Sequence, residues 1–476
     1  MQQEIYFNPF LLLFDYNNQK FILNVETREL IEINDEFLYE AIAKGIQNKL
    51  SFSDYKLIID NKEIYNFLIT HKLITDKPPN QYIKHKLSNI PMQGKYYAIH
   101  IITSLSCNLS CQYCFMLTDV DKLIKGQVIS TTDIVKGIEK FLSFPHTKNI
   151  VVTFYGGEPL LYPSLIDFTL EFLKKVKDIE LIYPTIITNG TIYNNKIENL
   201  LSKYGLSLNI EVSLDGDEKA HNYFRYDKQG RGTFDKVLNF IDKLRSYGFP
   251  VKILTTIGSH NVDRLPEIAE FYVKELKPDM VALNIPRALP KSDNKLGDVT
   301  DYYVSQYFKA TEILLKHNII ESNLFSILYL LTSEKVALEP CAAAGHEVAI
   351  GPNGFIGPCH AFLSAGKFRV KIDDFNDIEK DDSPFKVFKN INKLTTSPCN
   401  TCNISLICGG LNCIYDRYNL GLGLYRTDQK YCKIKKSSVE FLLKLIVENP
   451  DIIRKQLEIY EKVSSKWIPI KTSSDS

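Results

Sequence analysis

The sequence predicts an α/β protein whose central part is a parallel barrel or open barrel. Five buried strand patterns alternate with helical patterns between residue 96 and about residue 335; they read YYAIHIITSLS, VVTFYGG, LIYPTIITNG, LSLNIEVSLDG and VKILTTIG. The ten cysteines lie in two short segments. Three are at 107–114, directly after the first strand pattern, and seven are at 341–432, beyond the alternating region. At 476 residues the chain is too long for one core, so we expect about two to four domains.

Composition excludes several classes of protein. Lysine and arginine number 57 and aspartate and glutamate 56, so the net charge is +1, and 45% of residues are hydrophobic. A disordered chain and a strongly basic partner of nucleic acid are both excluded. The N-terminus has no signal-peptide pattern and no apolar run reaches about 18 residues, so we expect a cytoplasmic protein without a membrane span. Clustered cysteines in such a long chain indicate metal ligands rather than disulfides.

Residues 1–80 are expected to form a winged-helix-like module. Strand patterns over 8–34 with a turn at Asn17-Asn18 predict a small antiparallel sheet. Asp35 is a candidate cap for a helix that Gly45 closes, and 51–73 holds two more helical patterns. Eight basic and twelve acidic residues argue against DNA binding. A sheet edge that binds an extended peptide fits better, and a plain N-terminal cap is the alternative.

The remaining boundaries follow changes in pattern. Residues 81–95 are polar and read as a linker, 96–335 as the barrel, and 336–440 as a cysteine-rich region with short strands and turns. Residues 441–476 are expected to be a C-terminal helix that ends in a frayed TSSDS tail. In parallel barrels the chemistry lies at the carboxyl ends of the strands. The first cysteines and the polar motifs GGEP, TNG and SLDG each follow a predicted strand there.

The first cysteine group has the spacing CxxxCxxC in the loop after the first barrel strand, at Cys107, Cys111 and Cys114. Three thiolates on one loop can hold three irons of a cubane cluster and leave the fourth open for reaction. Zinc is the alternative, but tetrahedral zinc usually takes four protein ligands and this loop offers no fourth cysteine or histidine.

This motif, with an aromatic residue before its last cysteine, resembles the signature of radical SAM enzymes. The resemblance implies a partial (β/α)6 TIM-like barrel and a 4Fe-4S cluster whose open iron chelates the amino and carboxylate groups of S-adenosyl-L-methionine (SAM). It also implies an electron donor such as flavodoxin or ferredoxin, and a 5′-deoxyadenosyl radical that abstracts hydrogen. The cofactor supplies the chemistry, and the protein positions it.

The same resemblance implies a set of SAM contacts. Gly156, Gly157 and Glu158 of GGEP would receive the amino group, and Arg225 would pair with the carboxylate. Thr188 and Asn189 of TNG, with Ser213 and Asp215 of SLDG, would face the ribose and carboxylate, and Tyr113 would lie by the adenine. Taken singly, the motifs also fit ordinary turns, and Arg225 fits a surface ion pair.

The second cysteine region resembles the SPASM extension, which carries two auxiliary 4Fe-4S clusters, although CNTC alone is also common in zinc knuckles. By that resemblance an outer cluster takes Cys399, Cys402, Cys408 and Cys432, and an inner cluster takes Cys341, Cys359 and Cys413. Four residues separate Cys408 from Cys413 where the usual pattern has three. The inner cluster therefore has three thiolates, and either its fourth iron is open to a substrate group or His346 or Glu347 fills the position.

No cysteine is left over, which argues against a radical peptide epimerase, because that reaction typically needs a spare thiol. The N-terminal pattern resembles the PqqD-like element that binds leader peptides. We therefore expect a peptide (RiPP) maturase that binds a precursor peptide through its leader and forms a thioether from a cysteine to a carbon. Carbon–carbon or carbon–oxygen cross-linking and sulfatase-maturation-type oxidation are the alternatives. A zinc- or cluster-binding regulator with an inactive barrel is the competing class. The motifs identify no catalytic side chain.

Overall fold

The computed structural model describes residues 5–91, 94–118, 121–285, 301–339, 341–375, 378, 380–410 and 413–472. Its centre is an eleven-stranded sheet in the order β12-β11-β10-β9-β8-β7-β6-β13-β14-β15, with β16 paired to β8. The parallel strands are β6 (Tyr96–Ser104), β7 (His146–Gly156), β8 (Leu181–Thr188), β9 (Asn209–Ser213), β10 (Lys252–Thr256), β11 (Met280–Asn284) and β12 (Ile320–Glu321). In the described ranges β12 does not return to pair with β6, so the predicted barrel is an open one.

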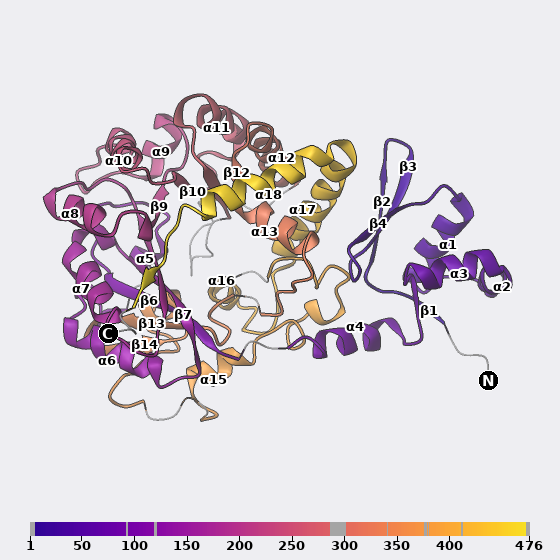
Figure 1. Cartoon of the computed structure of the whole chain (residues 1–476), viewed down its shortest axis with the longest axis horizontal. Coiled ribbons are helices and arrows are strands. Elements are labelled where there is room, and N and C mark those ends of the chain that lie inside the picture. The colour runs from indigo at the N-terminus through magenta and orange to yellow at the C-terminus, as the bar shows by residue number, and fades with distance from the viewer. Residues whose placement is uncertain are drawn as a thin grey trace.

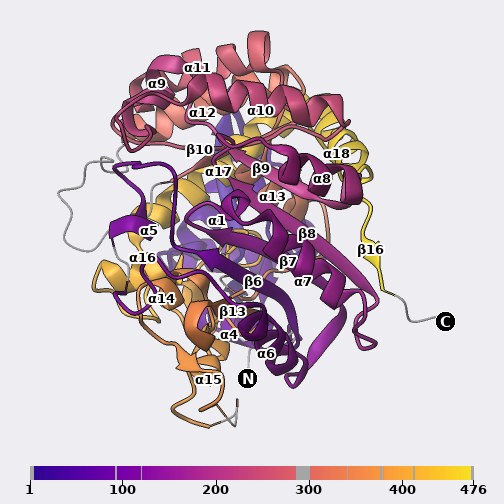
Figure 2. The same ribbon diagram turned by 90° about the vertical axis from the view of Figure 1, so that its left-hand side faces the viewer.

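Helices cover the outer side of this sheet, as Figures 1 and 2 show. They are α6 (Thr131–Leu142), α7 (Pro163–Leu173), α8 (Asn195–Tyr204), α9 (Glu218–Phe224), α10 (Phe234–Ser246), α11 (Leu265–Phe271) and α12 (Asp301–Lys316). The helix α6 is typical: Ser130 caps it, and its apolar stripe of Ile134, Ile138 and Phe141 is fully buried against the strands. The five strand patterns are confirmed, and β11 and β12 are two further parallel strands that they did not include.

The N-terminal part has its own small sheet. It contains β1 (Tyr6–Phe7), β2 (Leu11–Tyr16), β3 (Gln19–Asn24), β4 (Glu29–Glu32), β5 (Ile74–Thr75), α1 (Glu36–Ile46), α2 (Phe52–Asp60) and α3 (Lys62–Thr70). The predicted turn is confirmed, because Asn17 and Asn18 both have positive φ between β2 and β3, and Asp35 caps α1. Gly45 does not close α1, which continues to Ile46. A Cβ at Gly45 would lie 2.0 Å from the ring of Phe7, so the glycine permits close packing instead.

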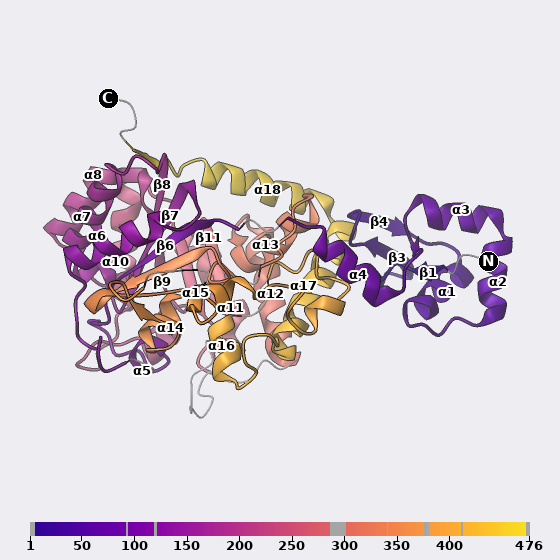
Figure 3. The same cartoon turned by 90° about the horizontal axis from the view of Figure 1, so that it is seen from below.

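The predicted linker contains a helix, α4 (Pro79–Ser88), with Pro79 in its first turn. In Figure 3 the N-terminal sheet and helices form one end of an elongated molecule, next to the C-terminal helices. Phe10 and Phe14 pack in one apolar cluster with Val439 and Leu442 of the long C-terminal helix and with Leu328. The N-terminal part is thus held against the rest of the chain by buried apolar contacts.

The cysteine-rich region continues the central sheet. The strand β13 (Glu347–Gly351) pairs in parallel with β6 and forms a hairpin with β14 (Phe355–Gly357), which pairs with β15 (Val370–Lys371). The helices of this region are α14 (His360–Ser364), α15 (Pro384–Lys389) and α16 (Ile414–Asn419), and α17 (Gln429–Glu448) begins in it. The elements outside it that are not yet given are α5 (Phe115–Thr118), α13 (Ser322–Leu331), α18 (Pro450–Ser464) and β16 (Ile470–Lys471).

The predicted C-terminal helix is two helices, because Pro450 ends α17 and begins α18. Of the predicted tail, residues 473–476 lie outside the described residues. In the described ranges no helix combines the length and the apolar character needed to cross a bilayer.

Candidate active site and cysteine groups

One cavity of about 860 Å³ opens at the carboxyl ends of the parallel strands. Its wall includes Cys107, Cys111 and Cys114 of the first cysteine group, and also Cys341, Cys359 and Cys413 of the second region. Eight of the nine predicted SAM contacts line it too: Tyr113, Gly156, Gly157, Glu158, Thr188, Asn189, Ser213 and Arg225. Residues that are up to about 300 positions apart in sequence thus face one space.

The two glycines of GGEP are required by the approach of the cysteine loop. A Cβ at Gly156 would lie 2.2 Å from the carbonyl oxygen of Ser104, and one at Gly157 would lie 2.1 Å from that of Ser106. Gly157 and Glu158 donate their backbone N–H groups to the same two carbonyls, at 2.8 and 3.0 Å. The end of β7 therefore fixes the backbone directly before Cys107.

Glu158 connects GGEP to TNG. Its carboxylate accepts hydrogen bonds from the Thr188 hydroxyl (2.7 Å), the Asn189 backbone N–H (2.7 Å) and the Leu160 backbone N–H (2.9 Å). Burial raises the pKa of Glu158 to about 7, and these donors oppose that rise. The Asn189 amide in turn donates to the Cys107 thiol at 3.6 Å. Glu158 therefore aligns two strand ends with the cysteine loop, and its role toward the SAM amino group stays a prediction.

Asp215 holds Arg225 and Tyr113, and its expected contact with SAM stays a prediction. Asp215 is fully buried behind the cavity wall and accepts hydrogen bonds from the Tyr113 hydroxyl and from Arg225 Nε at 2.9 Å. Arg225 holds the pKa of Asp215 well below its usual range, although burial opposes this. The guanidinium of Arg225 also lies over the Tyr113 ring, 5.3 Å from its centre. Asp215 therefore faces these two side chains rather than the cavity, and positions both of them.

The ten cysteines form three groups. Burial, followed by the thiolates of Cys408, Cys432 and Cys402, raises the pKa of Cys399 to about 12, so these four are neighbours. Burial, followed by Glu347, Cys413 and Cys341, raises the pKa of Cys359 well above its usual value. Burial likewise raises the pKa of Cys107 and Cys111 to about 11, and Cys111 neighbours Cys114. The grouping is the one expected from the sequence. Ligation by each group stays a prediction.

One buried arginine tests whether anionic clusters fit the second cysteine region. Arg417 is fully buried, and none of its three nitrogens has a hydrogen-bond partner in the described chain. Burial lowers the pKa of Arg417, and the charges of nearby thiolates oppose this. These thiolates come from both cysteine groups of the region: Cys341, Cys399, Cys413 and Cys432. An orphaned guanidinium is costly unless an anionic acceptor faces it. Thiolate-ligated iron–sulfur clusters supply such acceptors, so the donor set fits them.

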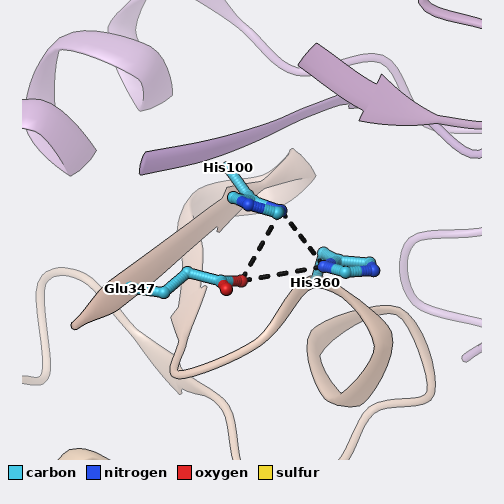
Figure 4. Close-up of side chains that lie close together, drawn as sticks. All are labelled: His100, Glu347 and His360. Carbon is cyan, nitrogen blue, oxygen red and sulfur yellow. Dashed lines mark hydrogen bonds and ion pairs between the residues drawn. The ribbon is translucent and has the colours of Figure 1, made fainter. Parts of the chain in front are cut away.

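Two side chains that the sequence analysis did not name, His100 and His360, lie with Glu347 beside the inner cysteines. His100 is on β6, Glu347 on β13 and His360 directly after Cys359, and all three line the cavity. Figure 4 shows the three side chains together. Strand alternation carried a signal for His100, because its neighbours Ile99 and Ile101 pack under the helices and leave it on the opposite face. The pairing of β13 with β6 could not be predicted from local sequence pattern, because the two strands are about 250 residues apart in the chain.

His346 and Glu347, the two sequence candidates for the inner group, point to different places. The ring of His346 bonds the Lys95 carbonyl through Nδ1 at 3.0 Å, and its Nε2 lies 3.5 Å from Glu339. The carboxylate of Glu347 lines the cavity together with the inner cysteines. Its charge, added to the effect of burial, raises the pKa of the Cys341 and Cys359 thiols. The structure brings only Glu347 to this group.

Comparisons with known proteins agree with this geometry. The family model described as "Radical SAM superfamily" matches residues 101–272. The chain is 23% identical over 411 residues to "Radical SAM cyclopropyl synthase TigE" of Paramaledivibacter caminithermalis, covering 80% of this chain and 82% of TigE. It is 31% identical over 179 residues to a "Cysteine-type anaerobic sulfatase-maturating enzyme" of Clostridium novyi, covering 36% of this chain and 46% of that enzyme.

Two solved structures share the fold. One is anSMEcpe with bound AdoMet, at a TM-score of 0.60 and 21% identity over 78% of this chain and 98% of that one. The other is Streptococcus suis SuiB bound to S-adenosylmethionine, at a TM-score of 0.51 and 19% identity over 89% and 99%. Residues 101–272 therefore form a radical SAM domain, and the chain is an enzyme.

Proposed function

We propose that this radical SAM enzyme modifies a ribosomally made precursor peptide and joins a cysteine sulfur of that peptide to a carbon atom. When bound, SAM and the first 4Fe-4S cluster supply the 5′-deoxyadenosyl radical that abstracts hydrogen. Two auxiliary clusters, held by the inner and outer cysteine groups, and an electron donor such as flavodoxin or ferredoxin complete the proposed machinery.

The observation that carries this proposal is the shared cavity. The first and the inner cysteine groups line one space of about 860 Å³, whereas the outer group lines a separate small pocket. A peptide side chain in that space can meet the radical at one side and the inner cluster at the other. Among the relatives, TigE is named a cyclopropyl synthase, and SuiB has also been solved with its precursor peptide SuiA. The second of these supports a peptide substrate.

This chain's own residues bind and orient. Arg225, held by Asp215, presents its guanidinium at the cavity wall for a carboxylate, and Tyr113 stands beside it for the adenine. Glu158 and the GGEP glycines keep the strand ends aligned with the cysteine loop. We assign SAM positioning to these residues.

Leader recognition is assigned to β4, which is an edge strand of the N-terminal sheet in the part of the chain that the structure describes. The strands β2 and β4 are its edges, and β2 is approached by Asn403 and Glu448. The backbone N–H of Ile33 points inward to Lys20, so by alternation that of Glu32 points outward from β4. An extended leader could therefore pair with β4.

Mass spectrometry of a cysteine-containing precursor tests the reaction. We expect loss of two hydrogens per link and loss of one thiol that iodoacetamide can alkylate. Loss of two hydrogens with every thiol still alkylatable indicates carbon–carbon or carbon–oxygen linkage. A hydrazine-reactive aldehyde indicates sulfatase-type oxidation. An unchanged mass alongside D-residues would refute cross-linking.

Two variants locate the step. C107A should abolish SAM cleavage, because it removes a thiolate of the first group. C413A should retain cleavage of SAM to 5′-deoxyadenosine but form no link. Zinc in place of iron, with no SAM cleavage by the anaerobic wild-type enzyme, would support the regulator class instead.

A matched pair of variants tests the leader site. E32P removes the outward N–H of β4, and E32A removes only the side chain. We expect E32P to weaken precursor binding by about tenfold or more and E32A by little, with uncoupled SAM cleavage unchanged in both. Equal binding by E32P and E32A would contradict leader pairing at β4.

A further inference from the structure

The side chains of His100, Glu347 and His360 converge beside the inner cysteine group. The two Nδ1 atoms lie 3.1 Å apart, and Oε1 of Glu347 lies 3.5 Å from Nδ1 of His100 and 3.7 Å from Nδ1 of His360. The two rings stack with their centres 4.9 Å apart, and Figure 4 shows both turned toward the carboxylate. The two imidazoles thus fix where this carboxylate can lie.

One oxygen of the buried Glu347 carboxylate has no hydrogen bond. The side chain is only 6% exposed and pairs with the two imidazoles at 3.5 and 3.7 Å, but Oε1 accepts no hydrogen bond within the described part of the chain. Buried carboxylates are normally hydrogen-bonded, paired or bound to a metal. Glu347 also lines the same cavity as Cys341, Cys359 and Cys413. After burial, its charge is the largest influence that raises the pKa of Cys359, and it raises the pKa of Cys341 as well. The unpartnered oxygen therefore lies where a metal ligand would be needed.

We propose that the Glu347 carboxylate is the fourth ligand of the inner auxiliary cluster, beside Cys341, Cys359 and Cys413, and that His100 and His360 position it. The inference rests on the proposed assignment of that cluster to the three cysteines. It goes further in stating that the fourth iron is closed by the protein in the resting enzyme.

The ligand type also bears on the proposed reaction. Iron in a sulfide cluster prefers soft thiolate to hard carboxylate oxygen. A substrate thiolate can therefore take the place of Glu347, whereas it could not easily displace a fourth cysteine. Glu347 would keep the iron from being lost until a substrate cysteine arrives.

Oxidative loss of iron tests this assignment without any turnover. In a C107A/C111A/C114A background only the two auxiliary clusters remain. Mild ferricyanide removes an iron that no side chain holds, which leaves as Fe²⁺ and converts a four-iron cluster into a three-iron cluster seen by EPR. Released iron is counted with a chelator. The variants are E347A, E347C and, as the matched control at the competing neighbour, H346A.

We expect the background, E347C and H346A to resist conversion, and E347A to release about one iron per chain with a three-iron EPR signal. Conversion of the background itself, to the same extent as E347A, would show an iron already open and overturn the proposal. Conversion by H346A but not E347A would place the ligand at His346. Loss of one separate divalent ion from E347A, with both clusters unchanged, would indicate a mononuclear metal held by the three side chains and would also overturn it. Failure of the inner cluster to assemble in the background would refute the cluster assignment itself.

Discussion

The buried pair of Arg225 and Asp215 should contribute strongly to local stability. Nε of Arg225 lies 2.9 Å from Oδ2 of Asp215, and the two side chains are 10% and 0% exposed. At an effective dielectric constant of about 20, the attraction at that distance is about 6 kcal/mol. Burial opposes part of it, and removal of one partner of such a pair costs about 3–5 kcal/mol, because the other charge stays buried and unpaired.

Hydrogen exchange measures this cost at the site. A tenfold change in exchange rate corresponds to about 1.4 kcal/mol in the free energy of local opening. R225M should therefore speed the exchange of protected amides in 209–227 by about 100- to 4,000-fold. D215N should act similarly, and D215N/R225M should recover more than about 2 kcal/mol relative to the sum of the single changes. The pKa of Asp215 is lowered in the folded state, so this contribution is present at neutral pH and is lost only as the pH falls below the ordinary aspartate range.

The same segment offers a matched control. Nε of Arg231 lies 2.8 Å from Asp227, but the arginine is 69% exposed, so R231M should speed the exchange far less than R225M does. Equal acceleration by R225M and R231M, or an additive double variant, would refute the argument from burial.

Three further outcomes follow from contacts in the site. Gly157→Ala should lower the iron content of the first cluster, because its Cβ would meet the Ser106 carbonyl, whereas Gly230→Ala has no neighbour within 4 Å and should cost only about 1–2 kcal/mol of backbone strain; iron analysis and circular dichroism compare them. R417M should shift the auxiliary-cluster reduction potential downward or lose iron, and R417K should lie between it and wild type, as measured by EPR redox titration. E158Q places an amide among three donors and should cost about 1–3 kcal/mol, measured by exchange of the TNG amides.

Local pattern predicted much of the fold because strand and helix periods depend on residues near in sequence. Alternation and turn residues placed β6 to β10 and the β2–β3 hairpin, and Asp35 capped the helix expected there. Errors arose where a distant contact decides the role of a residue. Gly45 is a glycine because Phe7 packs on it, and α17 and α18 separate at Pro450.

The sequence by itself determined the cysteine spacing and the motif order, and thereby the radical SAM domain. Spacing within a short loop constrains its ligands without any knowledge of the fold. Only the tertiary structure decided which distant groups share the cavity. It placed Asp215 behind Arg225, and it set Glu347 beside His100 by pairing β13 with β6. It also left the Arg417 guanidinium, near two cysteine groups, without a hydrogen bond to any described residue. These contacts join segments up to hundreds of residues apart, and local pattern does not encode such packing.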